Sequence, residues 1–261
     1  MRIPATALAL ALALCGPVQA QAARTPPQVG IPGCPDDVAV RASRELITFE
    51  SRGDRVRAHL YTPRGAPNGA GIVLLHGGTG FEMNAILFDA HAIQLASRGY
   101  RVILPAYFDV ARPDQTRRTV NARAWRRAAL DAAAQLTERG VPGERVALWG
   151  YSRGAGVAVD AATLPDSGVR LVVLAAGGGS VEDGAAELDL SALLLHARRD
   201  EAVPVRATRA LAEELRAAGA TVEVQELAFD GHQYDLPTWC SVFSTTRAFL
   251  ESRMEAMDGP S

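Results

Sequence analysis

Residues 145–156 read RVALWGYSRGAG, and this stretch decides the fold expected for the chain. Four apolar residues, VALW, stop at the pentapeptide GYSRG, after which small residues continue at helical spacing. This order predicts a buried strand, a sharp turn and a helix, with Ser152 at the apex of the turn. The turn forces Ser152 into a sparsely allowed backbone conformation, and Gly150 and Gly154 leave out the side chains that would collide there.

Strands and helices alternate on both sides of this turn. Buried strands are predicted at residues 70–75, 100–106, 145–149, 169–175, 192–196 and 221–227. Helices are predicted at residues 84–98, 122–139, 153–163, 205–218 and 237–254, and an antiparallel hairpin is predicted at residues 44–51 and 55–62. The alternation predicts an α/β fold, a mostly parallel sheet with helices on both faces, within a single domain at residues 38–261.

Composition excludes several classes of protein. The 261 residues are 48% hydrophobic and 21% charged, which is ordinary for a globular chain and excludes disordered and fibrous proteins. The formal net charge is -2, and no cluster of cations is interleaved with aromatic residues, so we expect no nucleic-acid partner. Every apolar run is shorter than the ~20 residues of a membrane span, so we expect no stable membrane insertion.

The N-terminus has the pattern of an export signal. Residues 1–20 combine a positive start, a short apolar run, a helix-breaking Gly-Pro pair and small residues near position 20. This predicts a cleaved signal peptide and a periplasmic or secreted protein. A lipid anchor at Cys15 is the alternative, although Leu14 is bulky for that motif. Residues 21–37, rich in Pro, Gly and Gln, predict an extended leader.

Export leaves two cysteines in the mature chain, Cys34 and Cys240. Two cysteines in an oxidising compartment predict a disulfide. It would join the leader to the start of the last predicted helix. Two free thiols, one buried and one exposed, are the alternative.

The GYSRG turn resembles the G-x-S-x-G nucleophile elbow of the α/β-hydrolase superfamily, which implies that Ser152 is a nucleophile. In that superfamily an acid and then a histidine follow the serine along the chain. The stretch HARRDEAVP after the strand at 192–196 resembles the acid turn and implies Asp200, with Glu201 as the alternative. The stretch AFDGHQY after the strand at 221–227 resembles the histidine loop and implies His232.

An acyl-transfer enzyme also needs donors for the oxygen that becomes negative. The stretch HGGTG at residues 76–80 resembles the superfamily's oxyanion turn, which implies the N–H of Gly78, with Thr79 as the alternative. The N–H of Arg153, next to the nucleophile, is the second predicted donor. A phosphate-binding loop is disfavoured for residues 76–80 because the Lys-Ser/Thr ending of such loops is missing there.

Within the superfamily the chain resembles the dienelactone hydrolase-like group, through HGGTG and the strand end PAYF at residues 105–108. It departs from dienelactone hydrolases in having Ser152 where they have cysteine, and YDL at residues 234–236 where they have a basic residue after the histidine. The resemblance implies a substrate pocket, and we expect its walls to include the aromatic side chains Phe81, Tyr107 and Tyr151.

These features predict a secreted serine hydrolase that cleaves small, soluble acyl esters or lactones through a Ser-His-Asp triad and an acyl-enzyme. No cofactor is implied, and the five histidines lack the spacing of a metal site. No long helical insertion follows the strand at 169–175, so we expect no large lid. A small-substrate peptidase of the prolyl oligopeptidase type and a non-catalytic binding protein on the same fold are the alternatives. The sequence predicts no oligomeric state.

Overall fold

The computed structural model describes residues 33–113, 118–182, 185 and 187–259. These residues belong to a compact unit at Ile31–Ser261. The predicted signal peptide and most of the predicted leader lie outside the described residues. No helix in the described part of the chain is both long enough and apolar enough to cross a membrane.

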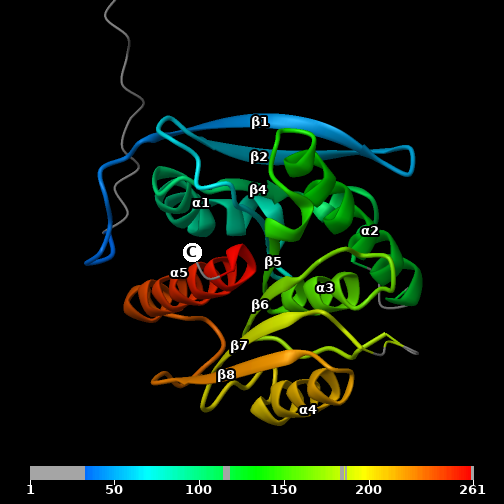
Figure 1. Ribbon diagram of the computed structural model, residues 1–261. Coiled ribbons are helices and arrows are strands. Elements are labelled where there is room, and N and C mark those ends of the chain that lie inside the picture. Colours follow the sequence, from blue (N-terminus) through cyan, green and yellow to red (C-terminus); the bar gives the residue numbers. More distant parts are fainter. Residues whose placement is uncertain (1–32, 114–117, 183–184, 186, 260–261) are drawn as a thin grey trace, which may run out of the picture. The chain divides into compact units, whose positions relative to one another are not determined.

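One eight-stranded sheet forms the centre of this unit, in the order β1-β2-β4-β3-β5-β6-β7-β8 (Figure 1). The strands are β1 Ala42–Ser51, β2 Asp54–Pro63, β3 Gly71–Leu75, β4 Arg101–Pro105, β5 Val146–Tyr151, β6 Leu171–Ala175, β7 Ser191–Ala197 and β8 Thr221–Leu227. β1 and β2 form an antiparallel hairpin, β2 pairs antiparallel with β4, and all other pairs are parallel. The predicted fold class, including its N-terminal hairpin, is confirmed.

In the described part of the chain, these α-helices cover the sheet: α1 Phe81–Ser97, α2 Arg118–Thr137, α3 Arg153–Ala162, α4 Val205–Ala217 and α5 Leu236–Asp258. In Figure 1, α1 and α5 lie on one face and α2, α3 and α4 on the other. The two cores follow the alternation of side chains along the strands. Ile72 and Leu74 of β3 belong to the core under α1 and α5, whereas Val73 and Leu75 belong to the core under the other three helices.

Helices α1 and α2 begin earlier than predicted, whereas α3 and α4 begin at their predicted residues, Arg153 and Val205. α1 begins at Phe81, directly after Gly80, whose φ of 91° ends the preceding turn. The first turn of α1 contains the exposed residues Glu82 and Met83, so its apolar periodicity is too weak to mark the helix start. α2 likewise begins at Arg118, four residues before its apolar pattern.

A disulfide joins Cys34 to Cys240, with a Cα–Cα distance of 5.4 Å and a sequence separation of 206 residues. The predicted pairing is therefore confirmed. It attaches residues just before β1 to the first turns of α5. Closing so long a loop lowers the entropy of the unfolded chain and stabilises the fold by ~2 to 5 kcal/mol in loop-entropy treatments.

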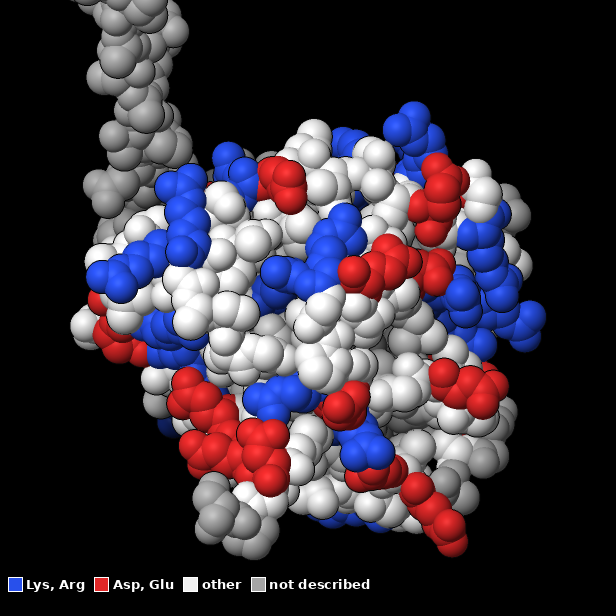
Figure 2. Space-filling view, turned by 45° about the horizontal axis from the view of Figure 1, so that its top comes forward, with Lys and Arg blue, Asp and Glu red and all other residues white. Residues whose placement is uncertain are grey.

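Charges of both signs are interspersed over the face of the molecule in Figure 2. Ion pairs join Arg57 to Asp109 at 2.8 Å and to Glu82 at 3.1 Å. A further pair joins Arg44 to Asp89 at 2.7 Å. Exposed pairs of this kind contribute little to stability, so the two buried cores and the disulfide carry the fold.

Candidate active site

The turn between β5 and α3 has the geometry of a nucleophile elbow. Ser152 has φ 55° and ψ -116°, a strained conformation for a residue with a side chain. A Cβ on Gly150 would lie 2.2 Å from the carbonyl oxygen of Gly154, and a Cβ on Gly154 would lie 2.1 Å from that of Leu75. Both glycines are therefore required by close backbone packing, as predicted.

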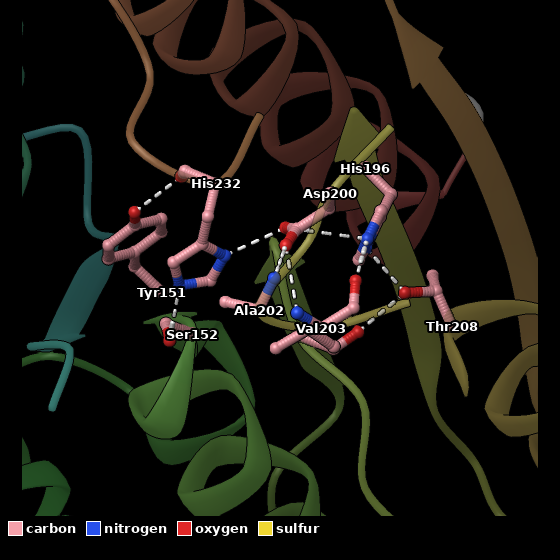
Figure 3. Close-up of polar contacts among 9 residues, drawn as sticks. Tyr151, Ser152, His196, Asp200, Ala202, Val203, Thr208 and His232 are labelled. Carbon is pink, nitrogen blue, oxygen red and sulfur yellow. Dashed lines mark hydrogen bonds and ion pairs between the residues drawn. The ribbon is translucent and has the colours of Figure 1, made fainter. Parts of the chain in front are cut away.

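Ser152, His232 and Asp200 form a continuous hydrogen-bonded chain (Figure 3). Nε2 of His232 lies 2.8 Å from Oγ of Ser152, and Nδ1 lies 2.7 Å from Oδ2 of Asp200. The three residues follow the carboxyl ends of β5, β8 and β7, which meet at one edge of a parallel sheet. Because a carboxylate has no proton, Nδ1–H donates to Asp200, and Nε2 is left to accept the hydroxyl proton of Ser152.

The carboxylate of Asp200 is held on both oxygens. Its Oδ1 accepts hydrogen bonds from the backbone N–H groups of Ala202 at 2.9 Å and Val203 at 2.8 Å, which leaves Oδ2 for His232. The side chain of Asp200 has no exposed surface. Glu201, the alternative acid, is exposed. Asp200 is the acid that this arrangement supports.

Tyr151, which precedes Ser152, contacts both the backbone and the ring of His232. Its hydroxyl donates to the backbone carbonyl of His232 at 2.7 Å, and its ring stacks on the imidazole with a centroid distance of 5.4 Å. Burial raises the pKa of Tyr151 well above its usual value, so this hydroxyl keeps its proton and remains a donor. Tyr151 thereby links the elbow to the histidine loop.

The HGGTG turn lies between β3 and α1 and is tied to the first turn of α1. Asn84 accepts a hydrogen bond from the N–H of Gly77 at 3.3 Å and donates to Oγ1 of Thr79 at 2.6 Å and the carbonyl of Gly80 at 2.7 Å. Sequence reasoning missed Asn84. Asn84 is the first residue of the helix predicted at 84–98, and its one available signal was a polar amide four residues after Gly80.

The backbone N–H groups of Gly78, Thr79 and Arg153 are the predicted oxyanion donors. Among the described residues, no protein acceptor takes the N–H of Gly78 or of Thr79, so both alternatives stay open. Arg153 is the first residue of α3, where an N–H has no acceptor inside the helix. The side chain of Arg153, which sequence reasoning did not use, lies over the ring of Trp125 at 5.6 Å and beside Gly78.

His76 at the start of this turn has a supporting position. It is completely buried and stacks on Tyr107 with a centroid distance of 4.1 Å, while the hydroxyl of Tyr107 donates to its backbone carbonyl at 2.7 Å. Burial lowers the pKa of His76 to about 4, so the ring is neutral at pH 7. The neutral ring donates from Nδ1 to the carbonyl of Gly77 at 2.9 Å.

The aromatic residues predicted as pocket walls are mostly buried. Tyr107 has 0% of its surface exposed, and this corrects its assignment: a side chain with no free surface supports the turn and does not face a ligand. It is buried because η1, the 3-10 helix Tyr107–Asp109, directs it between His76 and the core. Phe81 and Tyr151 are 7% and 4% exposed, and their contact with substrate stays a prediction.

One group of side chains elsewhere has the residue types of a metal site. Cys34, Asp36 and Asp37 bring three potential ligand atoms within 4.8 Å of one another. The sulfur of Cys34 is bonded to Cys240, and only a thiolate is a good metal ligand. Both aspartates are exposed. This donor set does not fit a metal ion.

The fold and the serine elbow define the class as an α/β-hydrolase-fold protein. The family model for the dienelactone hydrolase family matches residues 56–235. This range is more than half of the chain and includes Ser152, Asp200 and His232. The chain belongs to the dienelactone hydrolase family and is thus a hydrolase of the carboxylic ester class. No curated protein matches it significantly.

Solved structures share this fold at low sequence identity. A dienelactone hydrolase-like promiscuous phosphotriesterase from metagenomic libraries is 18% identical, with a TM-score of 0.69 over 81% of this chain and 98% of that one. An esterase of Pyrobaculum calidifontis is 19% identical, with a TM-score of 0.66 over 84% and 87%. An acylaminoacyl peptidase of Pyrococcus horikoshii is 14% identical, with a TM-score of 0.64 over 81% of this chain but 42% of that one.

Proposed function

We propose that the protein is an exported serine esterase that hydrolyses small, soluble esters or lactones through an acyl-enzyme on Ser152. The observation that carries this proposal is the chain from Oγ of Ser152 through the imidazole of His232 to Asp200, with contacts of 2.8 and 2.7 Å. A serine hydroxyl is a weak nucleophile near neutral pH, and these are the two groups that it needs: a base within reach and an acid that orients the base.

The reaction proceeds in two steps. Oγ of Ser152 attacks the carbonyl carbon while its proton passes to Nε2 of His232, and the carbonyl electron pair moves onto the oxygen. The N–H groups of Gly78 and Arg153 stabilise this oxyanion, and Asp200 stabilises the imidazolium. The imidazolium then protonates the leaving alcohol as the ester bond breaks. A water molecule repeats the attack, with His232 as the base, and releases the acid.

The loop after β6 supports a preference for small substrates. In the described part of residues 176–190 no helix forms, so this segment supplies no lid of the kind that covers a long acyl chain. Export is supported by the disulfide, because such bonds persist in oxidising compartments. The predicted site of processing, after residue 20, can be read from the N-terminal sequence of the exported protein.

The test is hydrolysis of p-nitrophenyl acetate, butyrate and laurate by the signal-free protein and by Ser152→Ala. We expect turnover that falls with chain length and disappears in Ser152→Ala. Ser244→Ala, which changes an exposed serine of α5, is the matched control and retains full activity. Unchanged turnover in Ser152→Ala would overturn the nucleophile assignment.

A peptidase is the second candidate, supported by the likeness to the acylaminoacyl peptidase structure. Ser152-dependent cleavage of N-acetyl-alanine p-nitroanilide, an amide, would favour it. A non-catalytic binding protein is the third candidate. It predicts no ester turnover and no labelling of Ser152 by a fluorophosphonate.

A further inference from the structure

A second histidine, His196, lies on the opposite side of Asp200 from His232, and the proposed mechanism does not use it (Figure 3). Nε2 of His196 lies 3.6 Å from Oδ2 of Asp200, the same oxygen that His232 contacts. His196 belongs to β7, four residues before the acid, and its side chain is 1% exposed. A buried imidazole next to a buried carboxylate needs a structural explanation.

His196 holds the turn that carries Asp200. Its Nε2 donates to the carbonyl of Val203 at 2.8 Å, and the N–H of that same residue donates to Oδ1 of Asp200 at 2.8 Å. His196 therefore bonds to the carbonyl of the residue whose N–H orients the carboxylate. A shift of Val203 would move the oxygen that faces His232.

The other ring nitrogen of His196, Nδ1, contacts helix α4. Its Nδ1 lies 2.5 Å from Oγ1 of Thr208 in α4, and that hydroxyl donates to the carbonyl of Gly177 at 2.6 Å. Thr208 is 1% exposed. The contacts thus run from the acid turn, through β7 and α4, to the loop that follows β6.

Gly177 packs directly on the nucleophile elbow. A Cβ at this position would lie 2.2 Å from Cβ of Ala155 and 3.5 Å from the carbonyl oxygen of Ser152. The loop after β6 therefore touches the backbone of the nucleophile. The contacts of His196 and Thr208 therefore connect the turn that carries Asp200 to the loop that packs on the nucleophile elbow.

We propose that His196 and Thr208 are positioning residues that set the place of Asp200 relative to Ser152. We call the contacts from Val203 through His196 and Thr208 to Gly177 the His196–Thr208 relay. This inference rests on the proposed function, because it assigns a role to Asp200 as the acid of that site. The relay touches neither the substrate nor the reacting atoms.

The count of protons shows why the hydroxyl of Thr208 matters. The carbonyl of Val203 has no proton, so Nε2 of His196 donates to it. Burial lowers the pKa of His196, and in the neutral ring Nδ1 is an acceptor. The single hydroxyl proton of Thr208 can go to Nδ1 or to the carbonyl of Gly177, but not to both at once. Without the hydroxyl, both groups would be buried and unpaired.

The experiment compares Thr208→Val, which keeps the shape but removes the hydroxyl, with Thr208→Ser, which keeps the hydroxyl. We expect Thr208→Val to lower kcat by about 10- to 100-fold with little change in KM, because a small misplacement of catalytic groups has effects of this size. Thr208→Ser should recover most of the wild-type kcat. Thr246→Val is the matched control, because Thr246 is equally buried and its hydroxyl bonds to Trp149 and Val242, away from the acid turn.

Two measurements distinguish a role of Thr208 in positioning Asp200 from a role in stabilising the fold alone. In Thr208→Val the acid limb of kcat/KM should move to lower pH, because a displaced Asp200 stabilises the imidazolium of His232 less. The downfield proton resonance of His232 Nδ1–H should shift or disappear. Thr246→Val should lower the thermal midpoint without either change. His196→Phe, which removes both ring nitrogens, should resemble Thr208→Val.

Activity of the wild-type protein distinguishes failure of the relay from failure of the proposed function. If the wild-type protein hydrolyses esters in a Ser152-dependent manner and Thr208→Val has normal kcat and a normal pH profile, the relay is refuted and the esterase stands. A Thr208→Val that only loses thermal stability refutes it as well. If the wild-type protein turns over no ester, the proposed function fails first.

Discussion

At Asp200, the two carboxylate oxygens have different hydrogen-bond partners. Oδ1 accepts from the backbone of Ala202 and Val203, and Oδ2 accepts from Nδ1–H of His232. In Asp200→Asn the amide oxygen keeps the backbone bonds, and the NH₂ group faces His232. The imidazole must then accept at Nδ1 and carry its proton on Nε2, where it cannot act as the base for Ser152. We expect kcat for p-nitrophenyl butyrate to fall by about 10³- to 10⁴-fold with a nearly unchanged thermal midpoint.

Asp230→Asn is the control for that substitution. Asp230 lies two residues before His232 in the same loop, but its carboxylate is 46% exposed, and its ion pairs are with Arg198 and Arg199 at 3.6 and 3.5 Å. Its activity should stay within a factor of two of wild type. Equal losses in both variants would mean that the charge of the loop, and not the tautomer of His232, sets the rate.

The element that brings the site together is α3, which packs against the end of β3 at its first turn. A Cβ on Gly154 would lie 2.1 Å from the carbonyl of Leu75 and 2.6 Å from that of His76, both backbone atoms that cannot move aside. Gly154→Ala should therefore displace α3 from the oxyanion turn and lower soluble yield and activity together. We expect at least a 100-fold loss of kcat/KM in any folded fraction, measured with p-nitrophenyl acetate.

Gly156→Ala, in the same helix, is the matched comparison. The nearest atom to its added Cβ is the carbonyl oxygen of Gly178 at 3.6 Å, an ordinary contact. Alanine also has a higher helix propensity than glycine by about 1 kcal/mol. This variant should keep its activity and gain stability in urea. A similar loss in both variants would indicate that α3 tolerates an added side chain at neither position.

For the molecule as a whole, buried histidines contribute to how stability depends on pH. Burial lowers the pKa of both His76 and His91 to about 4, whereas in the unfolded chain it is near 6.5. Between these values the unfolded state binds more protons, so the free energy of unfolding falls as the pH drops from 6.5 to 4. Asp160, whose pKa burial raises to about 6, has the opposite effect, but one group does not offset two.

His91→Phe tests this account without touching the site. His91 stacks on Phe243 with a centroid distance of 4.0 Å, and a phenyl ring preserves that packing. The loss of stability between pH 6.5 and 4 should become shallower by up to about 1.4 kcal/mol per pH unit, the effect of one proton. Urea unfolding at four pH values between 4.5 and 7.5 measures the slope. A slope equal to that of wild type would exclude His91 as a contributor.

Local sequence patterns were sufficient to predict the parts of the site that lie on a single turn. The elbow at Ser152 requires glycine on both sides, and the order of acid and histidine follows the order of the strands that precede them. Asp200 and His232 could therefore be proposed from the sequence, and the structure brings them together. The pairing of Cys34 with Cys240 needed only the export signal and the count of cysteines.

Only the tertiary structure determined the contacts between segments that lie far apart in the chain. Periodicity marks which face of an element is buried, but it does not say which side chain meets which across the sheet. An aromatic residue that follows a strand predicts a pocket wall at Tyr107, yet η1 buries this side chain against His76. Thr208 had no sequence signal at all, because its hydroxyl gains its partners only when α4 packs between the acid turn and the loop after β6.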